Sequence, residues 1–249
     1  MPRVAVVTGA SSGIGEALSR SLARDGWQCV LLARRKKRLR TLAEEIGGEF
    51  EVCDVADREA VEAVAARVLA RHRAVHLLVN NAGVAGRADF VGGDPERIEE
   101  VIRTNYLGSV WCLRAFLPGL EAAAPSDVVN VVSVAGAVAF PPSGPYSASK
   151  HAQLAFSRAT AAGLRSRGIR VHTVKPGFVE TEGFPQAYLP APVRRLVVGP
   201  EPIAEHIVRS IANGSGETSV PRYYGLAGML QALMPNLFAR VLGRSTIKR

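Results

Sequence analysis

Short apolar runs alternate with amphipathic segments along most of the chain. Continuous apolar runs are typical of strands buried on both faces of a parallel sheet, and apolar residues every three or four positions are typical of helices. The pattern therefore predicts an α/β fold with a largely parallel sheet. The expected strands are 4–7, 28–33, 49–53, 76–79, 128–132, 169–174 and 219–220. The expected helices run to about residue 24 after the first strand, and then over about 57–72, from 95 past 101, 146–167 and 201–211.

The pattern changes after the last expected strand. Residues 223–249 place leucines at helical spacing, and Pro235 should break or kink the helix that they form. Four cations and no acid lie within 240–249. Three interpretations stay open: a cover over a substrate pocket, a basic amphipathic element on an anionic membrane surface, and core packing or a subunit interface.

Composition and charge limit the classes of function. The chain has 249 residues, of which 47% are hydrophobic and 21% charged, as expected for one globular unit. The net charge of +9 is concentrated in residues 34–40, with six cations, and residues 240–249, with four. The remainder is balanced, with 21 cations against 22 acids. Nucleic-acid-binding proteins usually carry a broad basic stripe with aromatic residues, so we expect no nucleic-acid partner.

The sequence also bears on cellular location. Three cysteines, Cys29, Cys53 and Cys112, are interpreted as buried reduced thiols. No apolar leader precedes the first strand, and no apolar stretch reaches the roughly 18 residues of a spanning helix. We therefore expect a cytoplasmic protein, with the tail as a candidate peripheral membrane contact. The five histidines form no convincing metal-ligand set, and no metal is expected.

A glycine-rich turn connects the first strand to the first helix. Glycines at this turn let the backbone approach a pyrophosphate, which the helix N-terminus then stabilises. The spacing is Gly-x-x-x-Gly-x-Gly, and not the Gly-x-Gly-x-x-Gly of the usual dinucleotide fingerprint, so a plain strand-to-helix turn is the alternative. The candidate cofactor-binding residues of this turn are Thr8, Gly9, Ser11, Ser12, Gly13, Ile14 and Gly15.

The end of the second strand bears on which dinucleotide is bound. An acidic residue there would hold the ribose 2′-hydroxyl of NAD. This chain has Ala33, followed by Arg34 and Arg35, and a guanidinium matches a 2′-phosphate. We therefore favour NADP(H) over NAD(H), with Arg34 as the principal contact and the later cations facing water. The alternative is that the basic run is only the solvated start of a helix.

Further polar residues follow later strands. Asn80, Asn81, Ala82 and Gly83 come at the end of the fourth expected strand, where they can shape a loop against a ligand. Asn105 falls inside a helical pattern, where asparagine is a poor helix former. Either it makes hydrogen bonds at a site or it is merely exposed.

Residues 183–200 form a long segment that is rich in proline and aromatic residues. A loop of this length in a compact domain is usually a lid or a specificity segment, and its apolar character favours an apolar substrate. The residues that give it this character are Phe184, Pro185, Tyr188, Pro190, Pro192 and Pro200.

Ser133, Tyr146 and Lys150 are the candidate catalytic group. Tyr146 and Lys150 lie four residues apart, so a helix places them on one face, one turn apart. A phenol normally titrates near ~10, and a fixed ammonium nearby is expected to lower that pKa. The hydroxyl of Ser133 follows a strand and should point into the ligand crevice. The alternative for the pair is a half-buried tyrosine and a surface lysine on an ordinary helix.

Taken in order, these motifs resemble the short-chain dehydrogenases/reductases (SDRs). The resemblance spans residues 4 to about 220. Each motif is weak alone, but the ordered set is specific. The matching positions are Thr8-Gly9 through Gly13 and Gly15, Asp54, Asn80 to Gly83, Asn105, Ser133, Tyr146 with Lys150, and Pro176-Gly177 with Thr181.

The resemblance implies a single Rossmann-type, doubly wound parallel sheet of about seven strands with helices on both faces. It implies a catalytic domain at 1–222. The basic tail at 223–249 is longer than the family core and is expected either in the same domain or as a lid or surface element. In SDR terms Tyr146 is the acid/base, Lys150 lowers its pKa and binds the nicotinamide ribose, Ser133 holds the substrate oxygen, and Asn105 supports the proton relay. Implied cofactor contacts include Asp54, Val55, Asn81, Ala82, Gly83, Tyr146, Lys150, Pro176, Gly177, Val179 and Thr181.

The sequence thus predicts an NADP(H)-dependent oxidoreductase that interconverts a ketone or aldehyde and an alcohol, on an apolar substrate such as a 3-oxoacyl compound, a long-chain carbonyl or a steroid. A homodimer or homotetramer is expected. One departure keeps dual cofactor use open: many NADP-preferring SDRs carry a basic residue before the middle glycine, and this chain has Ser12. The alternative function is a redox-sensing protein that binds the dinucleotide without turnover.

Overall fold

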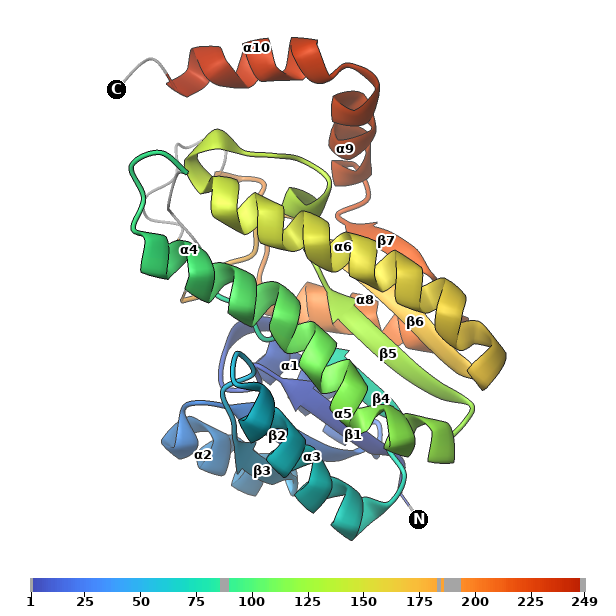
Figure 1. Cartoon of the computed structure of the whole chain (residues 1–249). Helices are drawn as coiled ribbons and strands as arrows, with labels where there is room; N and C mark the ends of the chain where they lie inside the picture. The colour runs from blue at the N-terminus through green and yellow to red at the C-terminus, as the bar shows by residue number, and fades with distance from the viewer. Residues whose placement is uncertain (1, 86–89, 183–184, 186–193, 247–249) are drawn as a thin grey trace.

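The computed structural model describes residues 2–85, 90–182, 185 and 194–246. It contains one seven-stranded sheet in the order β3-β2-β1-β4-β5-β6-β7, and every neighbouring pair is parallel (Figure 1). The strands are β1 Val4–Thr8, β2 Gln28–Ala33, β3 Glu49–Val52, β4 Leu77–Asn80, β5 Ser126–Val131, β6 Ile169–Pro176 and β7 Glu217–Val220. The doubly wound α/β fold expected from the sequence is confirmed.

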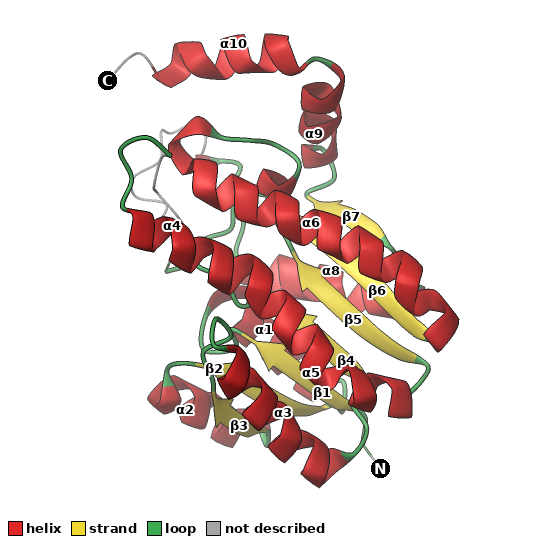
Figure 2. Cartoon of the chain, viewed as in Figure 1, coloured by secondary structure: helices red, strands yellow, loops and turns green. Residues whose placement is uncertain are grey.

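Helices connect the strands and cover both faces of the sheet (Figure 2). The α-helices are α1 Gly13–Arg24, α2 Lys36–Ile46, α3 Arg58–His72, α4 Pro95–Ile102, α5 Gly108–Ala122, α6 Gly144–Leu164, α8 Pro200–Asn213, α9 Tyr224–Leu233 and α10 Pro235–Thr246. A π-helical turn, η1 Arg103–Leu107, joins α4 to α5. Three 3₁₀ turns are η2 Val134–Gly136, η3 Pro141–Ser143 and η4 Arg165–Arg167.

Two apolar layers, one on each face of the sheet, hold the fold together. Ala5 and Val7 of β1 face the layer that includes residues of α1, α2 and α8, while Val4 and Val6 face the layer of α3 and α5. This alternation follows from the two-residue period of a strand and explains why the run is continuously apolar. Phe116 of α5 is fully buried, and removing such a ring typically costs about 3–5 kcal/mol.

Most expected boundaries agree with the structure to within a few residues. β6 extends to Pro176 and β7 begins at Glu217, so both are longer than expected. α6 begins at Gly144, two residues before Tyr146, because Gly144 and Pro145 form the first turn of the helix. Asp94 caps α4 by accepting a hydrogen bond from the Glu96 backbone N–H, and Pro95 opens the helix, as the sequence indicated.

The topology brings the candidate site residues to one edge of the sheet. β1, β4, β5 and β6 are adjacent, and all four run in the same direction. Their carboxyl ends therefore lie side by side, and the segments that leave them carry most of the residues singled out above. The expected loop at 183–200 lies largely outside the described residues.

The tail forms α9 and α10 (Figure 1). Met234 separates the two helices and Pro235 begins the second, so the expected break at Pro235 is confirmed. None of the residues of α9 is buried, which contradicts the interpretation that this segment packs in the core. Within the described ranges, no helix is both long enough and apolar enough to cross a bilayer.

Candidate active site

The glycine-rich turn packs tightly against the segment that follows β4. Gly9 and Gly13 have positive φ angles of 66° and 56°, which a glycine adopts without steric cost. A Cβ at Gly9 would lie 2.8 Å from the Ala82 Cα, and one at Gly15 would lie 2.5 Å from the Gly9 carbonyl oxygen. The turn therefore admits only glycine at these positions unless the backbone shifts.

Thr8 ties the glycine-rich turn to the Asn81 segment. Its hydroxyl donates to the Val79 carbonyl at 3.0 Å and accepts from the backbone N–H groups of Asn81 and Ala82, each at 3.0 Å. The Asn81 side-chain amide donates in return to the Thr8 carbonyl at 3.0 Å. These bonds fix two neighbouring strand ends relative to each other. Asn81 thus shapes the loop at the end of β4, as its position after the strand suggested.

Arg34 and Arg35 lie at the end of β2, beside this turn. The Arg35 guanidinium donates to the Ser11 hydroxyl at 3.0 Å and to the Ser12 hydroxyl at 2.5 Å, and it also pairs with Glu182. Arg34 lies 3.7 Å from a carboxylate oxygen of Asp54 and 3.9 Å from one of Glu100. Arg35 is thus the arginine that contacts the glycine-rich turn, whereas the sequence favoured Arg34 as the principal contact.

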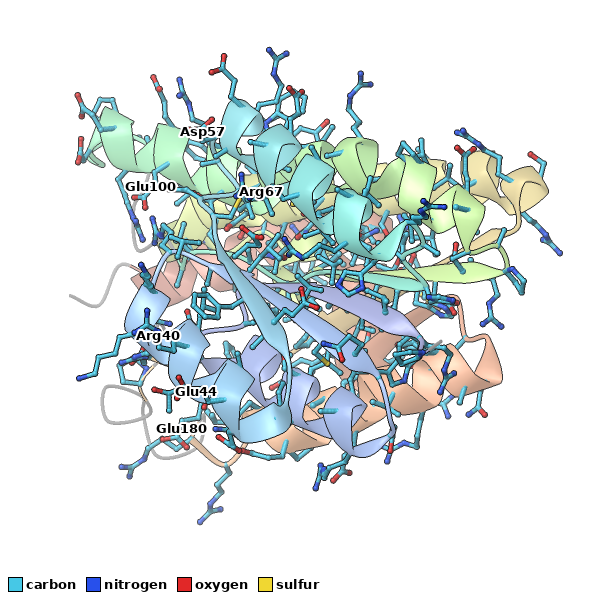
Figure 3. The ribbon with its side chains drawn as sticks, turned by 90° about the horizontal axis from the view of Figure 1, so that it is seen from below. Arg40, Glu44, Asp57, Arg67, Glu100 and Glu180 are labelled. Carbon is cyan, nitrogen blue, oxygen red and sulfur yellow. The ribbon has the colours of Figure 1, made fainter. Side chains whose placement is uncertain are left out.

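The later cations of the basic run divide into two kinds. Arg38 pairs with Glu182 at 2.6 Å and is still exposed, as the sequence suggested. Lys36, Lys37 and Arg40 are exposed, as expected, and Figure 3 shows Arg40 on the outer side of α2.

The turn and its surroundings fit a dinucleotide. Ser12 occupies the N-cap position of α1 but makes no side-chain capping bond, so its hydroxyl does not occupy the first backbone donors of the helix. Two glycines with positive φ bring bare backbone to the same place, and a guanidinium lies across the turn. Backbone donors, a helix N-terminus and a nearby cation together suit a phosphate-bearing ligand.

Ser133 and Tyr146 meet at the carboxyl end of β5. Ser133 follows this strand, and its hydroxyl accepts a hydrogen bond from the Ala135 backbone N–H at 3.1 Å. This hydroxyl lies within hydrogen-bonding reach of the Tyr146 hydroxyl. Burial raises the pKa of Tyr146, and the hydrogen bond from Ser133 offsets only part of that rise. The phenol is therefore protonated at neutral pH.

Lys150 lies one turn further along α6, as the spacing predicted. Its ammonium nitrogen is 5.8 Å from the centroid of the Tyr146 ring, and the residue is 4% exposed. It donates to the Val131 carbonyl at 3.2 Å and to the Gln153 side-chain oxygen at 2.8 Å. Burial lowers the pKa of Lys150 to about 7.

The expected effect of Lys150 on Tyr146 is wrong for the protein alone. The amine donates to the Val131 carbonyl and to Gln153, and burial lowers the pKa of Lys150, which reduces its positive charge near neutral pH. It therefore does not lower the pKa of the phenol. Burial instead raises that pKa. The alternative of a surface lysine is also wrong, because Lys150 is enclosed between α6 and the sheet edge.

Asn105 is completely buried in the π-helical turn η1, so its alternative as an exposed residue is excluded. Its side-chain oxygen accepts from the Val84 backbone N–H at 2.8 Å. Its amide donates to the Val84 carbonyl at 3.1 Å and to the Ser149 hydroxyl at 3.0 Å. A π-helical turn is often found at functional sites. Here it joins the segment after Gly83 to α6 through one side chain.

The segment after β6 closes the opposite side of the turn. Thr181 lies against Gly13, where an added Cβ would come within 3.0 Å of the threonine methyl. Val179 is buried and pairs with Val198 in an isolated bridge. The Gly177 backbone N–H donates to the Val220 carbonyl at 2.8 Å, which fixes Pro176 and Gly177 at the end of β6.

Asp54 and Val55 lie shortly after the end of β3, where Asp54 faces Arg34. Asp54 accepts from the Ala56 backbone N–H at 3.0 Å, and Val55 packs against Gly108. Figure 3 labels Glu100, the second acid that faces Arg34, in the same neighbourhood.

Sequence reasoning missed a set of buried polar residues beneath α6. Gln153 is completely buried, and its amide donates to the Ser109 hydroxyl of α5 at 2.9 Å. Ser157 bonds to Asn130 and Thr173 in the same layer. The available signal was the spacing: positions 150, 153 and 157 are polar where the inward stripe of a helix is normally apolar.

Comparison with known proteins agrees with this geometry. The short chain dehydrogenase family model matches residues 3–188. An uncharacterised oxidoreductase of Mycobacterium tuberculosis is 45% identical over 180 residues, which cover 72% of this chain and 70% of the relative. A farnesol dehydrogenase of Aedes aegypti is 36% identical over 199 residues, which cover 75% of this chain and 81% of the relative.

Solved structures with the same fold contain either form of the cofactor. An alcohol dehydrogenase from the archaeon Thermococcus sibiricus, complexed with 5-hydroxy-NADP, has a TM-score of 0.78 and 32% identity, and covers 88% of this chain and 96% of its own. A short chain dehydrogenase/reductase from Burkholderia phymatum, in complex with NAD, has a TM-score of 0.83 and 26% identity, and covers 95% of both chains.

Fold and site together define an oxidoreductase of the nicotinamide-dinucleotide type, with its candidate proton-transfer group at the carboxyl edge of a parallel sheet. The chain belongs to the short-chain dehydrogenase family.

Proposed function

We propose that this protein is an NADP(H)-dependent oxidoreductase that interconverts a ketone or aldehyde and an alcohol. The observation that carries the proposal is the convergence of Ser133, Tyr146 and Lys150 at the end of β5, beside the glycine-rich turn. When bound, the nicotinamide ring supplies or accepts the hydride. The protein then has to hold a carbonyl oxygen and exchange one proton with it.

Tyr146 is the proposed proton donor. Burial raises its pKa, so the phenol is protonated at neutral pH and can give its proton to the oxygen of a carbonyl substrate. Ser133 is proposed to hydrogen-bond that oxygen and orient it. Lys150 is proposed to hold the nicotinamide ribose, and Asn105 to keep η1 and α6 in register. A protonated phenol favours reduction of the carbonyl near neutral pH.

The proposed preference for NADP(H) has its support at the end of β2. No acid occupies position 33 to bind a 2′-hydroxyl, and Arg34 and Arg35 follow it. Arg35 places its guanidinium on the hydroxyls of Ser11 and Ser12. It thereby brings a cation to the place where many NADP-preferring relatives carry a basic residue in the turn itself. The NADP analogue in the archaeal alcohol dehydrogenase agrees with this preference.

The proposed substrate is apolar. Tyr224 of α9 packs its ring edge-on against Phe178, with centroids 6.0 Å apart, beside the segment that leaves β6. The relative named farnesol dehydrogenase acts on a long apolar alcohol, as its name states. A 3-oxoacyl compound, a long-chain carbonyl and a steroid all have this character.

The central test compares the protein with Tyr146→Phe on a panel of aldehydes and ketones, with NADPH consumption as the measurement. We expect the variant to lose turnover by about 10²–10⁴-fold, because the ring remains and only the proton donor is removed. Turnover that survives in the variant would reject the role of Tyr146. Tight NADPH binding without turnover by the unaltered protein would favour a redox-sensing function instead.

The cofactor preference is tested with Arg34→Ala and Arg35→Ala, with Arg40→Ala as the matched control on the outer side of α2 (Figure 3). We expect the first two to raise the KM for NADPH much more than that for NADH, because only NADPH carries the 2′-phosphate. Equal effects on both cofactors would reject the phosphate contact.

A further inference from the structure

A group of large apolar side chains on α9 and α10 is exposed to solvent. We call it the tail surface; its members are 48–74% exposed: Tyr223, Leu226, Met229, Leu230, Leu233, Met234 and Leu237. Scattered apolar residues are normal on a protein surface, but a contiguous set on two successive helices usually marks an interaction site. The two helices lie at one end of the molecule (Figure 1).

The charge of the same segment is one-sided. Residues 222–249 carry five cations and no acid, whereas residues 1–221 carry 26 cations against 22 acids. More than half of the net charge of +9 therefore lies in the last 28 residues. Arg240 of α10 is exposed beside the apolar members of the surface.

We propose that the tail surface docks on an anionic phospholipid bilayer. The exposed leucines and methionines would enter the boundary between headgroups and acyl chains, and the cations would meet the anionic headgroups. A second copy of this chain is a poorer occupant, because two-fold pairing of the surface would bring two segments of five cations each together. An apolar patch that carries cations and no acids complements anionic lipid.

The tail surface lies next to the candidate active site. α9 contacts η2, which directly follows Ser133, and α10 contacts η3, which directly precedes α6. The Gln231 side-chain oxygen also accepts from the Ala139 backbone N–H at 2.9 Å. Docking would therefore bring the segment between Ser133 and Tyr146 close to the bilayer. If the proposed function holds, an apolar substrate dissolved in the bilayer could reach the site without crossing water.

The test is co-sedimentation of the full chain with vesicles of phosphatidylcholine alone and of phosphatidylcholine with 30% phosphatidylglycerol. We expect at least tenfold stronger binding to the anionic vesicles, and weaker binding at high salt because salt screens the headgroups. Leu233→Asp should weaken this binding more than tenfold. Arg240→Glu should weaken it more than fivefold, since each cation near such a surface contributes about fivefold and the variant also adds a negative charge.

Arg24→Glu is the matched control, because it makes the same charge change at an exposed position at the end of α1. It should leave vesicle binding unchanged. No binding to anionic vesicles, or equal binding by the Leu233 variant, would overturn the proposal. The proposal would also be overturned if the protein bound no vesicles and light scattering showed an oligomer that Leu233→Asp dissociates. The tail surface would then contact a second copy of the chain. None of these outcomes depends on turnover.

A different observation, the hydrogen bonds of Gln153, carries a second inference. Gln153 lies one turn after Lys150 on α6 and is completely buried. Its oxygen accepts from the Lys150 amine at 2.8 Å, and its amide donates to the Ser109 hydroxyl at 2.9 Å. Ser109 donates in turn to the Asn105 carbonyl at 3.3 Å. One side chain thus joins the lysine to α5 and η1.

We infer that Gln153 is a positioning residue for Lys150. An ammonium has three donors, and Val131 and Gln153 each accept one of them. These two acceptors fix the direction in which the third donor points. This inference rests on the proposed function, in which that donor reaches the cofactor ribose.

The test compares Gln153→Leu, which removes the acceptor, with Gln153→Glu, which keeps it. Gln153→Leu should weaken NADPH binding about tenfold and move the alkaline limb of the pH profile to lower pH, because the ammonium loses a partner. Gln153→Glu should move that limb to higher pH, because a carboxylate favours the charged amine. NADPH affinity is followed by fluorescence, and kcat and KM are measured separately across pH.

Gln231→Leu is the control for NADPH affinity and for the pH profile, since Gln231 lies on α9 and accepts from the Ala139 backbone N–H rather than from Lys150. Unchanged pH profiles in both Gln153 variants, or a loss confined to thermal stability, would overturn the positioning role. Absence of turnover in the unaltered protein would instead count against the proposed function, and the fluorescence titration would still decide the role of Gln153.

Discussion

α6 and α9 depart from the usual distribution of polar and apolar residues in opposite directions. α6 turns polar side chains inward and buries Ser147, Ser149, Lys150, Gln153 and Ser157. α9 buries none of its residues and exposes Leu226, Met229, Leu230 and Leu233. Helices of globular proteins normally do the reverse, with an apolar stripe facing the core.

The two departures differ in whether the side chains have partners. Lys150, Gln153 and Ser157 are each hydrogen-bonded to neighbours within the fold, so their burial is compensated. The apolar side chains of α9 remain open to solvent in the part of the chain that the structure describes. The buried polar residues of α6 are thus satisfied within the fold, whereas the exposed apolar residues of α9 are the ones proposed above to meet a partner.

The largest effect should come from a substitution on α6, the helix with buried polar residues. Lys150→Met should lower kcat/KM for NADPH by about 10²–10⁴-fold, because the amine that the ribose is proposed to meet is removed while the bulk of the side chain remains. Lys37→Met, at an exposed position on α2, is the control and should leave activity unchanged. Steady-state kinetics at neutral pH measure both. Comparable losses in the two variants would mean that α6 is no more sensitive than the surface.

The next largest effect concerns stability, and it compares the hydrogen-bonded layer beneath α6 with the exposed side of α9. Asn130 accepts from Asn80 at 2.9 Å and donates to Ser157 at 2.8 Å, and all three are buried. Asn130→Leu leaves the Asn80 amide unpaired and removes one of the two side-chain partners of Ser157, so it should lower the free energy of unfolding by about 1–3 kcal/mol. Leu233→Ser, on the exposed side of α9, should change it by no more than about 0.5 kcal/mol. Urea denaturation measures the free energy of unfolding of both variants. Equal losses of stability would contradict the difference between the two regions.

The pH dependence of stability offers a finer test. Burial lowers the pKa of Lys150 to about 7, below the usual value near 10.4. Between these values the folded protein binds fewer protons than the unfolded chain, so this residue makes stability rise with pH in that window. The stability of Lys150→Met relative to that of the unaltered protein should therefore be highest near pH 7 and lowest near pH 10. Thermal midpoints across this range measure it, and a difference that stays constant with pH would contradict it.

The smallest effect concerns the attachment of α9. The hydrogen bond from Ala139 to Gln231 joins the helix to the loop between η2 and η3. Gln231→Leu should lower stability by about 1 kcal/mol or less, because the bond is exposed and water can replace Gln231. Its KM for an apolar carbonyl should rise more than its KM for NADPH, since α9 borders the proposed substrate side. A larger effect on NADPH would place the loop in the cofactor region.

Much of the fold could be predicted from the sequence because its signals are local. The run Val4–Thr8 is buried on both faces, and the glycine turn after it needs backbone angles that glycine adopts readily. The meeting of Tyr146 and Lys150 follows from helical spacing alone. These features require no knowledge of distant residues.

The remainder depended on contacts between segments far apart in the chain. Arg35 lies on Ser11 and Ser12 and also pairs with Glu182, which is 147 positions later in the chain. The partner of Lys150 is a glutamine whose other end is held by Ser109. Spacing cannot show which of two adjacent arginines turns toward a loop, or whether a lysine one turn away points at a ring or away from it.

The turn after β6 shows how little freedom the chain has where the tail meets the sheet. The ring of Tyr224 lies where a Cβ on Gly177 would be, only 2.1 Å from one ring carbon. Even a single methyl group at position 177 would push the aromatic ring aside and swing the start of α9 with it. The absence of a side chain at Gly177 therefore leaves the space that the Tyr224 ring fills at the start of α9.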